Sequence, residues 1–352
     1  MNILVRVPNW LGDTMMATPA VGEVKKIFPK ARVTVLAKPT FADFWRSFPG
    51  VEDVIVLHRG LAGFWGTVSR IKQGSFDLAL VLPTSFSSAF MVFAAEIPSR
   101  IGWGGEGRNL FLTQVVPHPE ERQKHLVWEY LDLVRHGLEK PLASKIFKLL
   151  SPVGDGAGKG RENIFKMMGV KEQKGLIAMS PGAAYGPAKR WPLPYWREVI
   201  CGLLKVRKES ILILGGLEEE DYLKGLLEGL EPEETTRIHW LVGRTTPLIL
   251  ADILTRCKLL VTNDTGPMHV AAAVGTPTVA LFGSTSPTWT RPFGLGHEVI
   301  YHQVECSPCF QKSCPIGYLC LNAISTKEVL AAVLAKLKKP SRIKGESLPR
   351  GV

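Results

Sequence analysis

The sequence predicts an α/β protein built from two doubly wound parallel sheets. Short apolar runs that suit strands alternate with patterns that suit helices, and this alternation occurs twice along the chain. The apolar runs show little polar alternation, which indicates strands buried on both faces, as in parallel sheets. The 352 residues also exceed what one hydrophobic core usually supports, so two domains are expected.

In the first half, the apolar runs predict strands at 3–7, 32–37, 54–57, 78–82 and 100–102. Helical patterns occupy 13–28, 63–73, 86–95 and 125–136, and a glycine-rich loop follows the last strand at 102–109. Pro19 lies inside the first helical pattern, so a kink or a late helix start is expected there.

The second half repeats the alternation, with strands predicted at 176–179, 211–214, 239–242, 259–261 and 279–282. Helices are predicted at 194–205, 219–227, 247–256 and 327–338. Residues 151–163 are rich in glycine and charge, which is typical of a linker. We therefore expect a first domain at 1–160, a second at 161–325, a C-terminal helix at 326–340 and a basic tail at 341–352.

The composition narrows the class of protein and its compartment. No apolar leader with a cleavage signal precedes the first strand, and no apolar run reaches eighteen residues, so a cytoplasmic protein is expected. The net charge of +11 is concentrated in 1–150 and in the tail. This surplus suits an anionic partner or a membrane surface. Nucleic acid is not favoured, because no basic stripe is interleaved with aromatic residues.

The segment 259–283 (LLVTNDTGPMHVAAAVGTPTVALFG) reads as strand, loop, helix and strand. Thr265 and Gly266 suit the start of the helix, which places Asp264 beside its N-terminus. Free backbone N–H groups and the helix dipole attract phosphate at such a place. The alternative is an ordinary turn between strand and helix. His269 on the first helical turn adds more polar chemistry than a plain turn needs.

The loop after the first strand (PNWLGDTMMATP) lies where a doubly wound sheet receives its ligand. Gly12 allows the backbone to pass close to a ligand. Asp13 has two interpretations: it caps the following helix, or it is a general base that takes a proton from an attacking hydroxyl.

The loop after the first strand of the second half (SPGAAYGPAKRW) is the equivalent position. Ser180 and Gly182 are small, and Lys189 and Arg190 supply cations that offset the charge of a departing phosphate. We favour Lys189 over Arg190. In the next strand–turn segment (ILILGGLEEED), Glu218 is the acid expected to bind ribose hydroxyls, and the other acids suit a helix start.

Four cysteines, Cys306, Cys309, Cys314 and Cys320, follow the spacing C-x2-C-x4-C-x5-C. They form either a structural zinc site or a set of free thiols that pack a loop. Cys201 and Cys257 lie on helical patterns and are expected in the core.

Taken together, these pieces resemble the bacterial ADP-heptose:lipopolysaccharide heptosyltransferases, glycosyltransferase family 9. The resemblance extends from VRVPNWLGDTMMATPAV to NDTGPMHVAAAVGTPTVALFGSTSPTWTRPFG, and PNWLGD and CSPCF are most similar to the enzymes that add the second heptose. It implies a GT-B fold, two Rossmann-like domains facing a central cleft. It also implies an inverting transfer from ADP-heptose to a lipid-linked lipopolysaccharide core, at the inner surface of the cytoplasmic membrane, with no metal required. A C-terminal helix that crosses back to the first domain is implied as well.

The same resemblance implies roles for individual residues. Asp13 would be the base, and Asn9, Trp10 and Gly12, with Trp103, would contact the acceptor. Lys189 would meet the diphosphate. The donor would contact Ser180, Gly182, Tyr185, Glu218, Asp264, Thr265, Gly266 and His269. Relatives often carry hydroxyl residues shortly before the lysine, whereas this chain has Ala183 and Ala184, so backbone N–H groups are the candidates there.

Three other functions compete with this interpretation. A family relative that uses another nucleotide sugar or acceptor would share all these motifs. An NAD-dependent oxidoreductase also has two such domains, but no G-x-G-x-x-G follows the first strand. A non-catalytic binder of anionic glycolipid would not need Asp13.

Overall fold

The structure is a computed structural model that describes residues 1–105, 107–119, 122–142, 149 and 175–338. The chain divides into two compact units, Met1–Pro152 and Val153–Val352. The expected linker at 151–163, the expected boundary after residue 160 and the basic tail at 341–352 lie outside the described residues. The predicted fold class, α/β with two doubly wound sheets, is confirmed.

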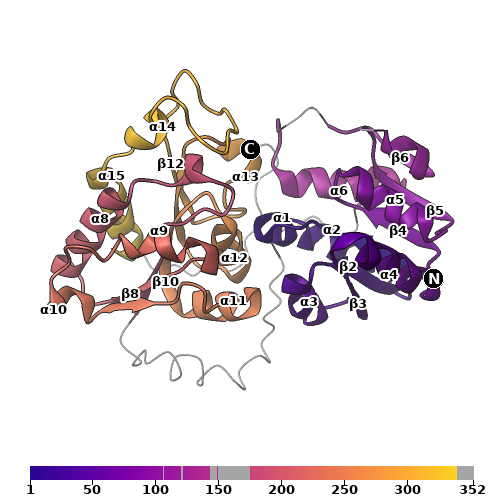
Figure 1. Cartoon of the computed structure of the whole chain (residues 1–352), viewed down its shortest axis with the longest axis horizontal. Helices are drawn as coiled ribbons and strands as arrows, with labels where there is room; N and C mark the ends of the chain where they lie inside the picture. Colours follow the sequence, from indigo (N-terminus) through magenta and orange to yellow (C-terminus); the bar gives the residue numbers. More distant parts are fainter. Residues whose placement is uncertain (106, 120–121, 143–148, 150–174, 339–352) are drawn as a thin grey trace. The chain divides into compact units, whose positions relative to one another are not determined.

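The first unit contains a parallel sheet in the order β3-β2-β1-β4-β5-β6 (Figure 1). Its strands are β1 (Asn2–Arg6), β2 (Arg32–Ala37), β3 (Asp53–Val56), β4 (Leu78–Val81), β5 (Ser99–Trp103) and β6 (Gln114–Val116). The chain runs outward from β1 to β3 and then restarts at β4 on the other side of β1. The point between β1 and β4 is therefore where the strand order reverses, and sheets of this kind bind ligands there.

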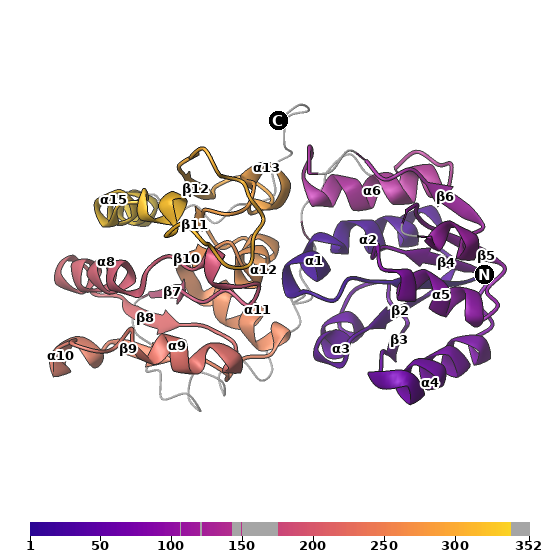
Figure 2. The same ribbon diagram turned by 45° about the horizontal axis from the view of Figure 1, so that its top comes forward.

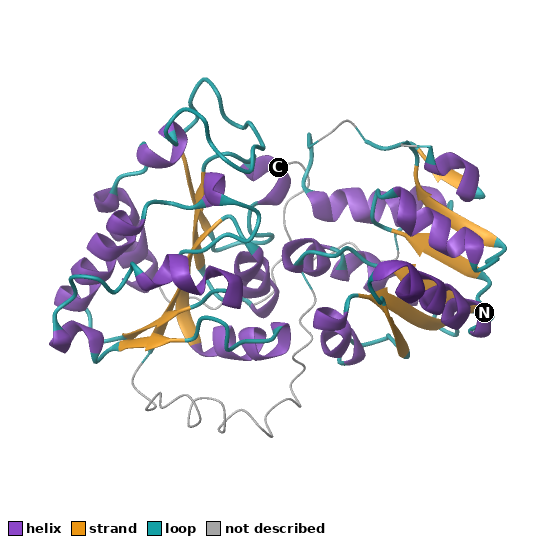
Figure 3. Cartoon of the chain, viewed as in Figure 1, coloured by secondary structure: helices purple, strands orange, loops and turns teal. Residues whose placement is uncertain are grey.

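Helices cover both faces of this sheet, as Figures 2 and 3 show. They are α1 (Leu11–Met16), α2 (Thr18–Ile27), α3 (Pro39–Arg46), α4 (Gly60–Gln73), α5 (Phe86–Ala94), the short 3-10 helix η1 (Arg108–Phe111) and α6 (Leu126–Gly137). The predicted helix at 13–28 is two helices, because Pro19 falls in the first turn of α2, where its missing N–H is tolerated. α1 and α2 pack with α6, whereas α4 packs with α5.

The second unit repeats the topology with the order β12-β11-β10-β7-β8-β9. Its strands are β7 (Leu176–Ser180), β8 (Ser210–Ile213), β9 (Ile238–Trp240), β10 (Cys257–Asn263), β11 (Thr278–Phe282) and β12 (Glu298–Tyr301). Here the order reverses between β7 and β10, which pair in parallel from Cys257 to Thr262. Cys257 is therefore a strand residue, and its expected place in a helix is wrong. Cys257 pairs with Leu176 of β7, so the chain is already in a strand at this residue, directly after α11 ends at Arg256.

The helices of the second unit are α8 (Leu193–Val206), α9 (Glu220–Lys224), α10 (Pro232–Thr235), α11 (Pro247–Arg256), α12 (Gly266–Val274), α13 (Pro287–Thr290), α14 (Leu319–Asn322) and α15 (Thr326–Lys338). The 3-10 helices η2 (Pro187–Lys189) and η3 (Leu217–Glu219) lie in loops that follow strands. α15 packs on α8, β10 and β11, so its described part belongs to the second unit. The expected crossing of this helix to the first domain stays a prediction.

Each unit has its own apolar core between sheet and helices. In the second unit the core holds Trp191 and Trp196, both fully buried and in edge-to-face contact. The Trp191 indole N–H donates to the carbonyl of Ile324 at 3.2 Å, which joins the segment before α8 to the segment before α15. None of the described helices is long and apolar enough to cross a membrane.

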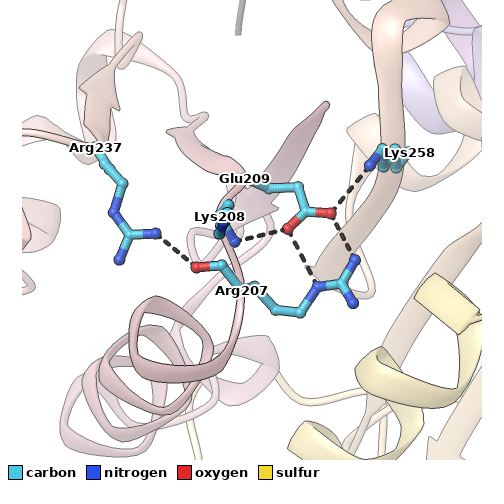
Figure 4. A network of polar contacts seen from close by, with 5 residues as sticks. All are labelled: Arg207, Lys208, Glu209, Arg237 and Lys258. Atoms are coloured by element: carbon cyan, nitrogen blue, oxygen red, sulfur yellow. Dashed lines mark hydrogen bonds and ion pairs between the residues drawn. The ribbon is translucent and has the colours of Figure 1, made fainter. Parts of the chain in front are cut away.

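A buried carboxylate joins the beginnings of two central strands of the second unit (Figure 4). The Glu209 carboxylate accepts hydrogen bonds from Arg207 at 2.6 Å and from Lys258, at the start of β10, at 3.0 Å. Arg237 in turn donates to the carbonyl of Arg207 at 2.6 Å. Burial alone would raise the pKa of Glu209, but the bonds from Arg207 and Lys258 outweigh it and lower the pKa to about 2.

Replacing this carboxylate is expected to destabilise the second unit. The pKa of Glu209 is lower in the folded chain than its ordinary value of 4.5, so its contribution is present above about pH 4.5 and is lost as the pH falls towards 2. We expect Glu209→Gln to lower the free energy of unfolding by about 1–3 kcal/mol at pH 7. Urea denaturation at pH 7 and at pH 3 measures this, with the exposed Glu228→Gln as the matched control. Equal stability of the two variants at pH 7 would contradict the assignment.

Candidate functional site

The strongest candidate site of the second unit lies at the carboxyl ends of β7 and β10. These strands are neighbours at the point where the strand order reverses, so the loops that follow them start side by side. The loop after β7 leads into η2, and the loop after β10 leads into α12. Topology therefore brings together SPGAAYGPAK and NDTG, although more than seventy residues separate them in the sequence.

Asn263 fastens the two loops to each other. Its side chain is fully buried and donates to the carbonyls of Pro181 and Gly182, at 2.6 and 3.3 Å. Its side-chain oxygen accepts from the backbone N–H of Trp191 at 3.2 Å. An amide that meets one donor and two acceptors in this way fixes the path of the β7 loop over the end of β10. Sequence analysis did not single out this residue.

Asp264 forms the most buried charged contact of the site. Its carboxylate is 4% exposed and accepts from the Lys189 ammonium, 14% exposed, at 2.6 Å. The Thr285 hydroxyl donates to the same carboxylate oxygen at 2.6 Å. Because a buried charge is costly without partners, these bonds determine where the Lys189 ammonium lies. The result is a held cation next to the first turn of a helix.

Lys189 and Arg190 have different surroundings. The Lys189 ammonium also lies over the Tyr185 ring, 4.9 Å from its centre. Arg190 instead lies over the ring of Tyr222 and donates to the carbonyl of Ala183 at 3.3 Å. Lys189 is thus part of the charged group at Asp264, and Arg190 holds the loop. This difference supports the preference for Lys189 that the sequence suggested.

α12 begins at Gly266, and its N-cap is Thr265. The Thr265 side chain makes no capping hydrogen bond, which leaves the cap position open to other groups. His269 lies on the first turn and is 3% exposed. Helix N-termini carry partial positive charge, so the end of α12 is a place suited to phosphate, and the Lys189–Asp264 ion pair lies beside it.

Glu219, rather than Glu218, is the acid whose side chain packs on the β7 loop, and the expected contact of Glu218 with ribose hydroxyls stays a prediction. Glu218 is exposed, whereas Glu219 is buried against the β7 loop. A side chain at Gly182 would meet the Glu219 carboxylate at 2.3 Å, and the N–H of Gly216 donates to that carboxylate at 2.8 Å. Burial raises the pKa of Glu219, and the N–H groups of Gly216 and Ala183 partly offset the rise. Sequence pattern does not separate two adjacent acids, because only packing decides which one turns inward.

The cysteine-containing segment, residues 305–318, supports the loop that carries Lys189. The Tyr185 hydroxyl donates to the carbonyl of Phe310 at 2.7 Å, and the N–H of Ala188 donates to the carbonyl of Lys312 at 3.0 Å. A side chain at Gly186 would meet the same Lys312 carbonyl at 2.4 Å, which requires glycine there. Tyr185 is therefore a supporting residue for Lys189.

The cysteines themselves are free thiols. Cys320 is buried, which raises its pKa, and Cys306 is exposed. Among the residues that the structure describes, no group of three or more His, Cys, Asp or Glu side chains is arranged to hold a metal ion. The zinc alternative for the four cysteines stays a prediction.

The first unit presents a second group of residues at the carboxyl end of β1. α1 starts at Leu11, and Trp10 is its N-cap without a side-chain hydrogen bond. Asp13 is the third residue of the helix, so the interpretation of Asp13 as the N-cap is wrong. It lies near the buried Tyr130 of α6, whose pKa is raised by burial and further by the charge of Asp13.

Cations surround the β1 loop. Arg6, buried in β1, donates to the Asn9 side chain at 2.9 Å, and burial lowers its pKa to about 10. The Lys38 ammonium lies 5.9 Å from the centre of the exposed Trp10 ring. The pKa of Lys38 is lowered by burial, then by the charges of Arg59 and Arg6. A single arginine in the otherwise apolar run NILVRV is the sequence signal that marks Arg6.

The remaining predicted contacts differ in their surroundings. Ser180 is buried at the end of β7, beside the loop that Asn263 holds. Trp103 is only 3% exposed and its ring packs near His118, so it lies in the core of the first unit, and its expected contact with the acceptor stays a prediction. The structure thus assembles Lys189, Tyr185, Gly182 and Asp264 in one unit and Asn9, Trp10, Gly12 and Asp13 in the other.

Comparison with known proteins adds to this geometry. The family model described as glycosyltransferase family 9 (heptosyltransferase) matches residues 65–319. The chain is 31% identical to lipopolysaccharide heptosyltransferase 2 of Escherichia coli, covering 87% of this chain and 90% of the relative. It is 30% identical to lipooligosaccharide heptosyltransferase 2 of Haemophilus influenzae, covering 83% and 86%. The solved structure of E. coli ADP-heptose lps heptosyltransferase II superposes with a TM-score of 0.82 at 28% identity, covering 96% of this chain and 99% of that one.

Removing the held cation is expected to weaken binding of ADP. A charge-assisted hydrogen bond to phosphate contributes about 1–3 kcal/mol, so Lys189→Ala should raise the Kd for ADP about tenfold or more. Isothermal titration calorimetry measures the Kd, and Lys224→Ala, an exposed cation of the same unit, is the matched control. Thermal denaturation checks that the buried Asp264 left behind does not unfold the unit. An unchanged Kd in the folded variant would remove Lys189 from the site.

Replacing Glu219 and replacing Glu218 are expected to change the Kd for ADP by different amounts in the same assay. Glu219→Gln places amide hydrogens against the N–H donors of Gly216 and Ala183, which should disturb the β7 loop. We expect its Kd for ADP to rise about fivefold or more, and Glu218→Gln to stay within twofold of the unchanged chain. The reverse order would restore Glu218 as the site residue.

Proposed function

We propose that this chain, which belongs to glycosyltransferase family 9 (heptosyltransferase), moves a heptose from ADP-L-glycero-D-manno-heptose to a heptose of the lipopolysaccharide inner core, as a heptosyltransferase II. The observation that carries the proposal is similarity over most of the chain to relatives named heptosyltransferase 2. The local geometry of the second unit is consistent with it, because a nucleotide diphosphate needs a fixed cation and free N–H groups.

The donor site would be the group at the ends of β7 and β10. Negative charge builds on the leaving diphosphate as the bond to the anomeric carbon breaks. Lys189 and the first N–H groups of α12 carry fixed positive charge that would stabilise this developing charge. Since Asp264 and Thr285 already hold Lys189, little reorganisation is needed when the charge appears. We propose that these groups make a metal at the reacting sugar unnecessary.

Asp13 would be the general base. In an inverting transfer the acceptor oxygen attacks the face opposite the leaving diphosphate, and its proton passes to a carboxylate. A weakly basic carboxylate is sufficient when the proton leaves late, once the anomeric carbon is cation-like. Asp13 lies on the first turn of α1, the helix that follows the central strand β1 of its sheet. The neighbouring Asn9, Trp10 and Gly12 would contact the acceptor.

The acceptor would be a lipid-linked, anionic glycolipid, and the enzyme would act at the inner surface of the cytoplasmic membrane. Residues 1–150 carry 18 Lys and Arg against 13 Asp and Glu. Arg6 and Lys38 place part of this charge beside the Asp13 loop. Positive potential at that loop would attract the phosphate and carboxylate groups of the acceptor. A family relative with another nucleotide sugar or acceptor heptose is the alternative that the same residues would serve.

The base assignment predicts a loss of transfer without a loss of donor binding. We expect Asp13→Asn to lower kcat at least a hundredfold, because the isosteric amide takes up no proton, while its Kd for ADP changes less than twofold. Mass spectrometry of a mono-heptosylated core acceptor incubated with ADP-heptose measures the product. The exposed Asp43→Asn of the same unit is the matched control.

Two results would contradict the proposal in different ways. Transfer by Asp13→Asn at a rate near that of the unchanged chain would reject Asp13 as the base. No product from the unchanged chain with ADP-heptose, but product with a different nucleotide sugar, would reject heptose as the transferred group and favour the alternative.

A further inference from the structure

One face of the first unit carries a set of large apolar side chains that the fold leaves uncovered. We call it the aromatic face and define it by its outer side chains, which are all at least 43% exposed, and by the half-buried rings beneath them. The outer side chains are Leu61, Trp65, Phe86, Phe93 and Leu110, and the rings beneath are Phe64, Phe90 and Phe111. They come from α4, α5 and η1, elements that pack against one another (Figure 2).

The aromatic face is a built surface rather than a scatter of exposed residues. The Phe90 ring is its centre, with Phe64 stacked at 5.8 Å and Phe111 edge-on at 5.2 Å. Trp65, Phe86 and Phe93 also contact the Phe90 ring. Aromatic pairs of this kind order one another, so Trp65, Phe86 and Phe93 are held in place by the rings they contact.

The sequence of α5 explains why this surface stays outside. Met91 and Val92 face the sheet and are buried in the core of the first unit. Phe86, Phe90 and Phe93 follow the spacing of the opposite helical face. α5 therefore has two apolar faces, and the sheet covers only one. A contiguous uncovered apolar face on a described domain indicates an interaction site.

The charge around the aromatic face selects the kind of partner. Residues 57–76 contain His58, Arg59, Arg70 and Lys72 and no acid, and residues 82–95 contain no charged residue. The Arg100 guanidinium lies over the Phe93 ring, 5.4 Å from its centre. The nearby Glu96 is paired with Lys72 at 2.6 Å. An apolar centre with a cationic border is complementary to an anionic bilayer surface.

Two copies of this face would bring like charges together in a symmetric pair, which disfavours self-association.

The aromatic face begins at the edge of the sheet that carries Asp13. In a parallel sheet all strands end at one edge, and α4, α5 and η1 follow β3, β4 and β5 as α1 follows β1. The first residues of these helices, Gly60, Phe86 and Arg108, therefore lie at the same edge as the Asp13 loop. A surface seated there on a bilayer would keep that loop close to the level of lipid headgroups.

We propose that the aromatic face docks the first unit on the anionic surface of a phospholipid bilayer, with Leu61 and Trp65 entering the headgroup region and the basic residues at its border meeting lipid phosphate. The role of this docking in presenting a lipid-linked acceptor to Asp13 rests on the proposed function. Binding to lipid itself does not, because it needs neither donor nor acceptor.

The test is co-sedimentation of the full chain with vesicles that contain no glycolipid. We expect binding to vesicles of phosphatidylethanolamine and phosphatidylglycerol, weaker binding at high salt, and little binding to pure phosphatidylcholine. Leu61→Ser with Trp65→Ser should lower the partition coefficient at least tenfold. Val206→Ser with Leu319→Ser, similarly exposed side chains of the second unit, is the matched control and should bind as the unchanged chain does.

Three results would overturn the docking proposal. The first is that the unchanged chain does not bind anionic vesicles. The second is that the Leu61/Trp65 variant binds them as well as the unchanged chain does. The third is that sedimentation velocity finds the unchanged chain as a dimer and the variant as a monomer. The last result would assign the face to a second copy of the chain. Circular dichroism checks that the variants are folded. Normal transfer by the Leu61/Trp65 variant to a deacylated acceptor, with slow transfer to an acylated acceptor in vesicles, would support docking. The vesicle-binding measurement needs no transfer assay, so it tests the docking proposal even if the proposed function is wrong.

Discussion

The site of the second unit depends on the buried carboxylate of Asp264. Taken out of water, this carboxylate is tolerable only because Lys189 and Thr285 both donate to it at 2.6 Å. The three residues follow three different strands, β10, β7 and β11, so their bonds also fix the relative positions of three loops. The same contacts that make burial possible thus hold a lysine ammonium beside the start of α12. One ion pair therefore both permits the burial of the Asp264 carboxylate and fixes the position of the Lys189 ammonium.

Further hydrogen bonds complete this arrangement. The Asn263 side chain holds the β7 loop by donating hydrogen bonds to the carbonyls of Pro181 and Gly182. Glu219 accepts a hydrogen bond from the backbone N–H of Ala183 in this loop, and the cysteine-containing segment supports the loop through Tyr185. Glycine is required at 186 because the Lys312 carbonyl occupies the space of a side chain, and at 182 a side chain would displace the Glu219 carboxylate. These contacts hold the loop at several points, which the donor role proposed for it would require.

The two units share a topology but use it differently. Both have six parallel strands with a reversal of order beside the first strand of the unit. In the second unit the loops at this point are joined by buried polar bonds. In the first unit the corresponding loop carries an exposed tryptophan and is bordered by cations, with an uncovered aromatic face along α4 and α5. A rigid anion site suits a small nucleotide, and an exposed basic and apolar surface suits a large amphipathic partner.

The sequence by itself determined the fold class, five of the six strands of each sheet, and the loops that carry the candidate residues. Buried strands and helix starts have local signals, such as the apolar run before Asp264 and the proline in the first turn of α2. Elements with weaker signals, such as α3 and the edge strand β12, were not predicted. Only the tertiary structure decided that Glu219 rather than Glu218 faces the β7 loop, that Trp103 lies in the core while Trp65 is exposed, and that Cys257 belongs to a strand. The reason is physical: periodicity specifies which face of an element a residue occupies, but the packing of distant segments decides whether that face is covered.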